Sequence, residues 1–225
     1  IITSSGYRIS QLEKNGSIIF RMPVHSKNPI VMIINIFRIL KIVKKNKINI
    51  IHARSRAPAW SCYFAAKFAK VRFITTFHGT YNFNNNFKKF YNSIMIKSDH
   101  IIAISNFIYG EIRNKYLYSK KNISIIQRGI NVESLDPSKT DSIKVNNFLK
   151  KYSVKKESIK LVLPGRVTGW KGHSIAIDAM AYLSNNSKYE FELFFVGPTD
   201  NLNLKNNLLK KIKELNLEDT IKFVQ

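Results

Sequence analysis

Strand-like and helix-like segments alternate along nearly the whole chain, and this alternation restricts the possible folds more than any other feature. Short apolar runs predict strands at residues 18–22, 48–52, 71–77, 100–104 and 123–127. Helical periodicity predicts helices at residues 29–44, 58–70, 84–97 and 105–116. Ser105 is suited to cap the last of these helices. Strands that alternate with helices in this way are typical of a parallel sheet covered by helices.

The alternation restarts after a polar stretch that contains Asp136 and Pro137. The second series of expected helices and strands spans residues 142–151, 160–164, 172–183, 191–196, 202–215 and 220–224. We therefore predict an α/β protein with two Rossmann-like domains, at 1–136 and 137–225. Three strands make a small sheet, so the second domain is expected to be incomplete. The missing initiating Met and the abrupt stop after a strand-like run favour truncation at both ends.

Composition supports a folded chain without a membrane-spanning segment. Hydrophobic residues make up 44% and aromatic residues 12%, as in globular proteins. The longest apolar stretch, 29–43, is interrupted by Asn35, Arg38 and Lys41, so no spanning helix is predicted. Cys62 is the only cysteine, which excludes an internal disulfide and a cysteine-based zinc site and favours the cytoplasm.

The chain is strongly basic, with 37 Lys and Arg against 14 Asp and Glu and a formal net charge of +23. Such a balance is typical of proteins that bind a polyanion or an anionic membrane surface. A sequence-wide preference for Lys, Ile and Asn would produce the same charge without any binding role. A nucleic-acid-binding protein is a further alternative, although no fold signature or cluster of aromatics among basic residues supports it.

One strand-to-helix junction has the composition of a phosphate-binding loop. Ligands of open α/β sheets bind beyond the carboxyl ends of the strands. After strand 160–164, Gly165 and Gly172 permit tight turns, while Arg166 and Lys171 flank the start of a helix. Backbone N–H groups and two cations there would hold a phosphate or a pyrophosphate, and the alternative is a basic surface loop. The spacing matches neither a Walker A loop nor Gly-x-Gly-x-x-Gly, so neither an ATPase nor an NAD enzyme is indicated.

Two other strand ends carry polar side chains. Arg54, Ser55 and Arg56 follow strand 48–52, where two arginines could hold an anionic acceptor group or a donor phosphate. Alternatively, these arginines bind a neighbouring loop while Trp60 packs in the core. His78 follows strand 71–77, and a histidine at such a position often has a structural role. 

The string GRVTGWKGH at 165–173 resembles the donor-phosphate motif of glycosyltransferase family 4. Four further segments occur in the matching order: HARSRAPAWS at 52–61, TTFHGTYN at 75–82, IAISNFI at 102–108 and QRGINVESLDP at 127–137. Together they resemble a bacterial branch of this family that is associated with lipopolysaccharide-core assembly. The resemblance covers nearly the whole chain.

This resemblance implies a GT-B architecture, in which two Rossmann-like domains face a cleft. The N-terminal domain would bind the acceptor and the C-terminal domain the nucleotide-diphospho-sugar. The implied reaction is retaining transfer of the sugar to a glycolipid or lipopolysaccharide-core acceptor, with no metal and no cofactor. Arg166 and Lys171, with Gly165 and Gly172, would bind the donor diphosphate and stabilise it as it leaves. Nucleic acid is not an expected partner.

The resemblance also implies roles for residues at the other strand ends. His78 matches a histidine that faces the cleft near the transferred sugar, where it would orient the reaction without acting as general base. Arg54, Ser55, Arg56 and Gly79 are assigned to the acceptor side of the cleft. Gly197 follows the strand 191–196, close to the family's site for the nucleotide base and ribose. Arg128 and Gly129 lie at the presumed crossover between the domains, where a structural role is expected.

Two expected motifs of this family are missing: the Gly-rich loop after the first strand and the Glu-x7-Glu segment that contacts the donor. We therefore expect this chain to hold only part of its donor site and to be inactive by itself. The parent enzyme is expected in the cytoplasm, attached peripherally to the membrane through the basic helix around 36–47. A GT-B nucleotide-sugar epimerase is the alternative with the same fold.

Overall fold

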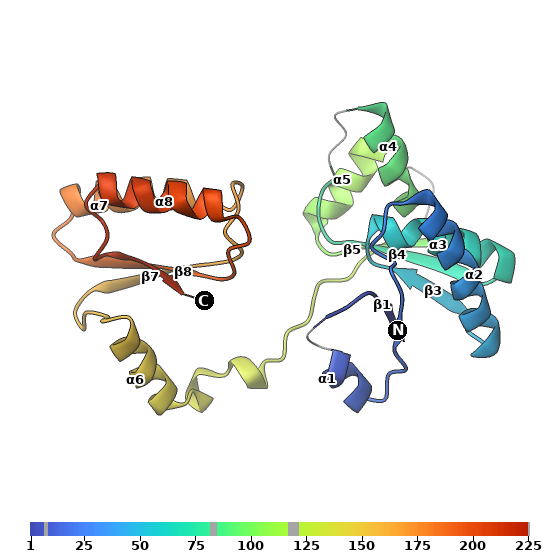
Figure 1. Ribbon diagram of the computed structural model, residues 1–225, viewed down its shortest axis with the longest axis horizontal. Helices are drawn as coiled ribbons and strands as arrows, with labels where there is room; N and C mark the ends of the chain where they lie inside the picture. The colour runs from blue at the N-terminus through green and yellow to red at the C-terminus, as the bar shows by residue number, and fades with distance from the viewer. Residues whose placement is uncertain (7–8, 82–84, 117–121, 225) are drawn as a thin grey trace. The chain divides into compact units, whose positions relative to one another are not determined.

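The computed structural model describes residues 1–6, 9–81, 85–116 and 122–224, and the chain divides into two compact units. Unit 1 is Ile1–Ile130 and unit 2 is Asn131–Gln225. Each unit has its own main parallel sheet (Figure 1). Each also has its own hydrophobic core. Asn82 and Asn84, which belong to a predicted motif and a predicted helix, lie outside the described residues. No helix in the described part of the chain has the length and hydropathy that crossing a membrane requires.

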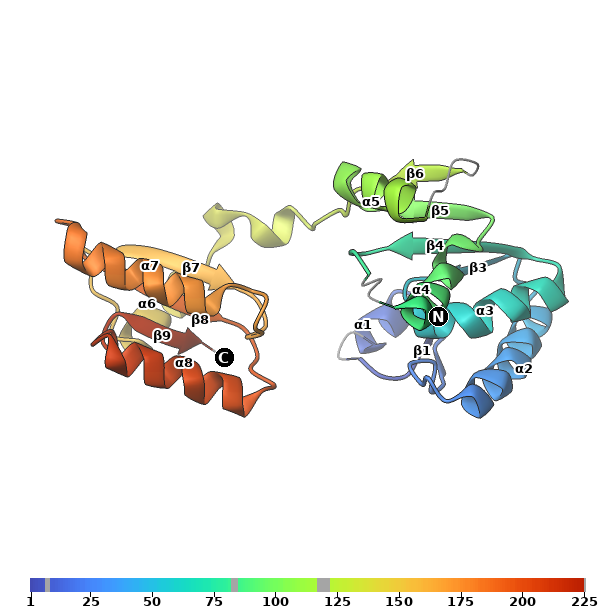
Figure 2. The ribbon, with the colours of Figure 1, turned by 90° about the horizontal axis from the view of Figure 1, so that it is seen from above.

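The main sheet of unit 1 has four parallel strands, which lie side by side in chain order (Figure 2). They are β3 (Ile50–Ala53), β4 (Arg72–Phe77), β5 (His100–Ala103) and β6 (Ile123–Ile125). Its longer helices are α2 (Pro29–Lys45), α3 (Arg56–Ala69), α4 (Asn86–Ser93) and α5 (Asn106–Tyr116). Because the strands are parallel, their carboxyl ends lie along one edge of the sheet.

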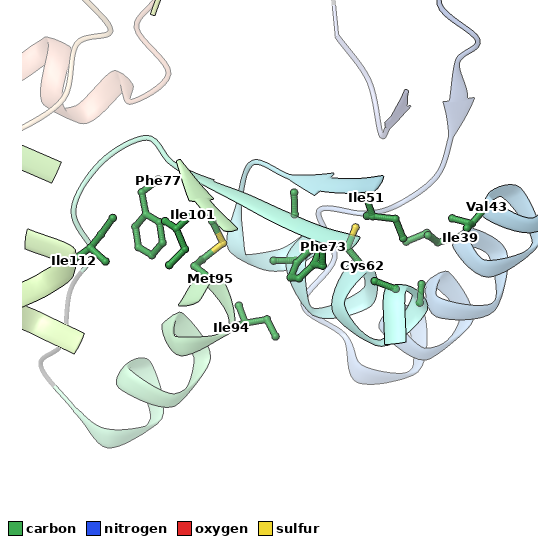
Figure 3. Close-up of a cluster of buried hydrophobic side chains, with 14 of the residues drawn as sticks. Ile39, Val43, Ile51, Cys62, Phe73, Phe77, Ile94, Met95, Ile101 and Ile112 are labelled. Atoms are coloured by element: carbon green, nitrogen blue, oxygen red, sulfur yellow. The ribbon is translucent and has the colours of Figure 1, made fainter. Parts of the chain in front are cut away.

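Local sequence signals explain where these helices begin. Asn28 accepts a hydrogen bond from the Ile30 backbone N–H at 2.9 Å, and Pro29 occupies the first position of α2. Ser105 accepts from the Ile108 N–H at 3.2 Å, so its predicted capping role is confirmed. The core beneath these helices is apolar, and Figure 3 shows side chains of β4 and β5 packed against those of the helices.

Two parts of unit 1 differ from the sequence prediction. The helix expected at 84–97 ends at Ser93, and a 3-10 turn, η1 (Ile94–Ile96), follows and turns Ile94 and Met95 into the core. The strand expected at 18–22 is reduced to β2 (Phe20–Arg21), which pairs only with β1 (Ile2–Thr3) in a separate sheet. Helix α1 (Ile9–Lys14) was not predicted. It has 6 residues, less than two turns, and none of them is buried.

Unit 2 is a three-stranded parallel sheet with helices on both faces. Its elements are the 3-10 turns η2 (Glu133–Leu135) and η3 (Pro137–Lys139), the helices α6 (Ser142–Lys151), α7 (His173–Asn186) and α8 (Leu202–Glu214), and the strands β7 (Ile159–Pro164), β8 (Phe191–Val196) and β9 (Ile221–Val224). Consecutive side chains of β8 point to opposite faces. Phe194 therefore packs against Phe148 of α6, while Phe195 packs against His173 of α7. Helices α6 and α7 accordingly lie on opposite faces of this sheet (Figure 1).

Candidate functional site

In unit 2, the loop between β7 and α7 holds the residues predicted to bind a diphosphate. Gly172 is the N-cap of α7, with a left-handed φ of 80° that favours glycine, and Lys171 directly precedes it. Gly172 has no side chain with which to cap this helix. The N–H groups of its first turn therefore remain open to an anion, which the helix dipole would also favour.

The two predicted cations of this loop are both exposed to solvent. The Lys171 ammonium lies 4.4 Å from the centre of the Trp170 ring. The Arg166 guanidinium lies 3.7 Å from a carboxylate oxygen of Asp200, a partner that no sequence motif indicated. Exposed ion pairs contribute only about 0–1 kcal/mol, so Asp200 restrains Arg166 weakly and leaves it free to bind another anion.

The loop after β8 approaches the loop after β7 so closely that it excludes a side chain. The Gly165 N–H donates to the Val196 carbonyl at 2.8 Å, and the Val167 N–H donates to the Pro198 carbonyl at 3.0 Å. Gly197 has a φ of 149°, and a Cβ atom there would lie 2.5 Å from the Gly165 carbonyl oxygen. Gly197 thus has a packing role at this edge, and the nucleotide contact predicted for it stays a prediction.

His173, the last residue of the loop motif, lies under the loop and not on its surface. Its side chain is 2% exposed, and its ring packs edge-on against Phe195 with centroids 4.9 Å apart. Burial lowers the pKa of His173, and the Thr168 backbone raises it by a smaller amount. The ring is therefore neutral at physiological pH. This histidine therefore supports the loop from below.

In unit 1, two predicted site residues, Arg54 and His78, meet Arg128 at the carboxyl edge of the sheet. Arg54 follows β3, His78 follows β4 and Arg128 lies just beyond β6. Arg54 Nε lies 3.1 Å from His78 Nε2, and a terminal nitrogen of Arg128 lies 2.6 Å from His78 Nδ1. Burial lowers the pKa of His78, and the charges of Arg54 and Arg128 lower it further, so this ring is neutral at physiological pH.

Arg56 is directed elsewhere. It donates to the Asn92 side-chain oxygen at 2.8 Å and lies 4.4 Å from the centre of the Tyr81 ring. Trp60 donates its indole N–H to the Tyr91 carbonyl at 3.2 Å and packs in an aromatic cluster. Arg54 and Arg56, which were predicted to act together, thus have separate surroundings, and Arg56 contributes to packing between α3 and α4.

Ser55 and Gly79 border the Arg54–His78–Arg128 cluster in the chain. Ser55 is the N-cap residue of α3, yet its hydroxyl makes no capping hydrogen bond. A Cβ atom at Gly79 would meet no atom of the described residues within 4 Å, so the described structure leaves space beside the backbone after His78.

A hollow of about 920 Å³ lies at the other end of the same sheet. Lys47, Lys67, Lys70, Arg72 and Lys97 line it together with Asp99. Arg72 begins β4, whereas His78 follows the end of that strand. Because ligands of open α/β sheets bind at the carboxyl ends of the strands, we do not assign the substrate site to this basic hollow.

Comparison with known proteins shows the family. Residues 1–134 match the family model described as Glycosyltransferase Family 4, and residues 145–225 match the model described as Glycosyl transferases group 1. The chain belongs to glycosyltransferase family 4. The family prediction is confirmed, while the lipopolysaccharide-core branch stays a prediction.

Individual relatives of this glycosyltransferase chain agree. A crystal structure of a glycosyltransferase from Rickettsia africae ESF-5 is 36% identical with a TM-score of 0.82, over 99% of this chain and 58% of that one. An uncharacterized glycosyltransferase of Methanocaldococcus jannaschii is 28% identical over 96% of this chain and 57% of its own length. The chain thus spans less than three fifths of the length of these two relatives.

More distant structures confirm the GT-B fold class that the sequence predicted. Anabaena HepE in complex with UDP is 15% identical with a TM-score of 0.74, over 97% of this chain and 58% of that one. A UDP-N-acetylglucosamine 2-epimerase from Rickettsia bellii is also 15% identical, with a TM-score of 0.55, over 100% of this chain and 60% of that one. The fold alone therefore does not separate a transferase from an epimerase, and the two family models favour the transferase.

Proposed function

We propose that the protein to which this chain belongs transfers a sugar, with retention, from a nucleotide-diphospho-sugar to a glycolipid or lipopolysaccharide-core acceptor. The observation that carries this proposal is the loop between β7 and α7. It places Arg166, Lys171 and the uncapped end of α7 on one short segment. The Anabaena relative was solved with UDP and with UDP-glucose, which supports a nucleotide-sugar as the donor.

The loop has the chemistry that the leaving group requires. Breaking the bond between the anomeric carbon and the phosphate oxygen places negative charge on the diphosphate. Preorganised donors and cations at that position stabilise the transition state more than the ground state. In this proposal, Arg166, Lys171 and the first-turn N–H groups of α7 perform this task without a metal or another cofactor.

His78 orients the transferred sugar or its acceptor in this proposal. Retention requires the acceptor hydroxyl and the leaving phosphate to occupy the same face of the sugar, so positioning is the main demand on this side. Two arginines face the ring nitrogens of His78 and lower its pKa. A group with a lowered pKa between two cations is a weak proton acceptor, so we do not assign His78 as general base.

The donor site is tested by titrating the chain with UDP in a calorimeter. Lys171→Ala and Arg166→Ala should each weaken UDP binding by roughly tenfold, because each removes a charge-assisted contact of about 1.5 kcal/mol or more. In a transfer assay of the protein that contains the chain, either substitution should reduce turnover by about 10²–10³-fold. NMR of the product anomer would test retention.

Lys188→Ala is a matched control. The Lys188 ammonium lies 5.2 Å from the centre of the adjacent Tyr189 ring, much as Lys171 lies over Trp170. Lys188 belongs to the loop before β8, at the opposite edge of the sheet from the predicted donor loop. The donor-site assignment fails if UDP binds equally to wild type and Lys171→Ala, or if Lys188→Ala weakens binding as much as Lys171→Ala does.

A further inference from the structure

The side chains of Arg54, His78 and Arg128 form a cluster that unit 1 builds alone. Three strands of one sheet position them, β3, β4 and β6 (Figure 2). Arg54 follows β3, His78 follows β4 and Arg128 lies beyond β6. The two arginines approach different nitrogens of the His78 ring. Arg54 lies 3.1 Å from Nε2 and Arg128 lies 2.6 Å from Nδ1. The geometry of this cluster therefore does not depend on unit 2.

The hydrogen-bonding capacity of the cluster is unbalanced. A neutral imidazole has one N–H donor and one acceptor nitrogen, while arginine has only donors. The ring of His78 can therefore accept from Arg54 or from Arg128, but not from both at once. Protonation of the ring would remove its remaining acceptor, and the lowered pKa of His78 disfavours it. At least one of the two guanidinium groups thus faces a ring nitrogen that cannot accept a hydrogen bond from it.

The charge of the cluster is also unbalanced. Among the ion pairs of the described residues, none includes Arg54 or Arg128. Two guanidinium groups on one half-buried ring repel each other, and an anion between them would replace this repulsion by attraction. Each guanidinium has five N–H donors, so most of the donors in the cluster remain to bind a ligand.

The start of α3 adds to the same local field. This 14-residue helix begins at Arg56, two residues after Arg54, and the hydroxyl of its N-cap residue Ser55 does not bond to the first turn. The partial positive charge of the helix N-terminus is therefore not offset by its cap. Ser55 is exposed, so its hydroxyl can donate to a ligand at this edge.

We infer that Arg54, His78, Arg128 and the amino end of α3 form a binding site for a phosphate group. Two planar guanidinium groups match the several oxygens and the double charge of a phosphate better than the two oxygens of one carboxylate. Assigning this phosphate to the acceptor rests on the proposed function, in which Arg166 and Lys171 bind the donor diphosphate. The donor diphosphate has the same chemistry, so the experiment separates the two sources.

The first measurement is a titration of the chain with inorganic phosphate at constant ionic strength, followed by calorimetry and by the ring ¹⁵N shifts of His78. We expect saturable binding that raises the pKa of His78, because the anion offsets the charges of Arg54 and Arg128. Arg54→Gln and Arg128→Gln should each lower the affinity by about tenfold or more. Arg128→Lys keeps the charge but loses the planar fork, so its affinity should fall between wild type and Arg128→Gln.

Arg72→Gln is the control, because it removes the same charge at the opposite end of β4, where Arg72 lines the basic hollow. Phosphate affinity should be unchanged in this variant. The inference is overturned if wild type shows no saturable binding, or if Arg72→Gln weakens binding while Arg128→Gln does not. Should Arg128→Gln fail to fold, Arg54→Gln and Arg128→Lys apply the same criterion.

UDP titrations identify the source of the phosphate. If Arg128→Gln weakens binding of inorganic phosphate but not of UDP, the site serves an acceptor phosphate. Equal weakening of both would overturn the assignment to the acceptor and place the donor diphosphate there. Lys171→Ala should leave the phosphate-dependent shift of His78 intact, so a failed donor site and a failed phosphate site give different results.

Discussion

At the scale of single residues, the close contact between Gly197 and Gly165 restrains the loop that we assign to the donor. Gly197→Ala would place a Cβ atom 2.5 Å from a backbone oxygen and 2.8 Å from a backbone carbon, and neither can rotate away as a side chain would. The φ of 149° adds backbone strain for any residue with a Cβ atom. We expect Gly197→Ala to destabilise the chain by about 1–3 kcal/mol in urea denaturation.

Gly169→Ala is the control for this prediction. Gly169 belongs to the loop between β7 and α7, but a Cβ atom there would meet nothing within 4 Å and its φ is not positive. This variant should keep nearly the stability of wild type. Equal denaturation midpoints for Gly197→Ala and wild type would mean that the strand ends of β7 and β8 do not approach each other as described.

The sequence predicted site residues separately at each strand end and gave no contacts between different strand ends. Arg54, His78, Arg166 and Lys171 were singled out because each follows an expected strand or flanks the helix after it. Contacts between different loops depend on strand order and twist, so the contacts of Arg128 with His78 and of Asp200 with Arg166 were missed. Arg128 directly follows the expected strand 123–127, so the rule that selected the other residues would have selected it as well.

At the scale of elements, a buried carboxylate ties β8 to its surroundings. Glu192 is 1% exposed, and it accepts from Ser158 Oγ at 2.5 Å and from Lys222 Nζ at 2.6 Å. The backbone N–H of Lys155 donates to it as well, at 2.9 Å. Burial raises the pKa of Glu192, but the hydrogen bonds and the charge of Lys222 outweigh burial, so the pKa lies below its ordinary value of 4.5.

Glu192→Gln should therefore destabilise the chain by about 3 kcal/mol at neutral pH, because it leaves the charge of Lys222 uncompensated. A carboxylate with a lowered pKa in the folded state stabilises that state fully above pH 4.5. This contribution is lost as the pH falls from 4.5 through the folded-state pKa. The free energies of unfolding of wild type and Glu192→Gln should accordingly converge as the pH falls from 4.5 through the folded-state pKa, as urea denaturation would show.

Glu190→Gln provides the comparison for the buried carboxylate. Glu190 lies 3.1 Å from the Lys155 ammonium, but its side chain is 68% exposed. An exposed pair contributes about 0–1 kcal/mol, so this variant should be nearly as stable as wild type at every pH. A similar loss in both variants would show that Glu192 acts as a surface charge.

Helices and strands were predicted well where capping and periodicity agree. The helix at 142–151 and the strand at 191–196 have the predicted bounds, and α2 extends one residue beyond its prediction. The helix expected at 84–97 breaks into α4 and η1 because Ile94 and Met95 turn into the core. This break depends on tertiary packing, which the local sequence does not show. Two-residue strands such as β1 are too short to show a period.

At the scale of the whole molecule, alternation of strands and helices predicted the α/β class, and the family comparison confirmed the GT-B fold. The same features predict nothing about acceptor or membrane, because those depend on surface chemistry and not on core periodicity. Two explanations of the strong positive charge remain: a compositional preference for lysine, and binding to an anionic partner. The surface of α2 provides a way to separate these two explanations.

Helix α2 exposes apolar side chains next to basic ones. Asn35, Ile39 and Val43 face the core, while Ile30 is 68%, Ile33 53% and Phe37 62% exposed. The exposed positions recur at intervals of three and four residues, so they form one stripe along the helix. Lys41, Lys44 and Lys45 follow toward its C-terminal end and are also exposed. An apolar stripe with adjoining cations is typical of helices that lie on an anionic membrane surface.

We therefore expect the chain to sediment with vesicles that contain an anionic lipid and not with neutral vesicles at physiological salt. Replacing Lys41, Lys44 and Lys45 together by Gln should weaken this binding by roughly 100-fold, because each basic residue near the surface contributes about 1 kcal/mol. Phe37→Ser should weaken it as well, since it removes apolar area from the bilayer interface.

The matched control replaces three exposed lysines of α6, Lys144, Lys150 and Lys151, by Gln. It changes the net charge by the same amount and leaves α2 intact. If the charge is only compositional, both triple variants lose binding equally and Phe37→Ser has no effect. If α2 is the membrane-binding surface, the α6 variant keeps most of its affinity for anionic vesicles, while the α2 variant remains in the supernatant.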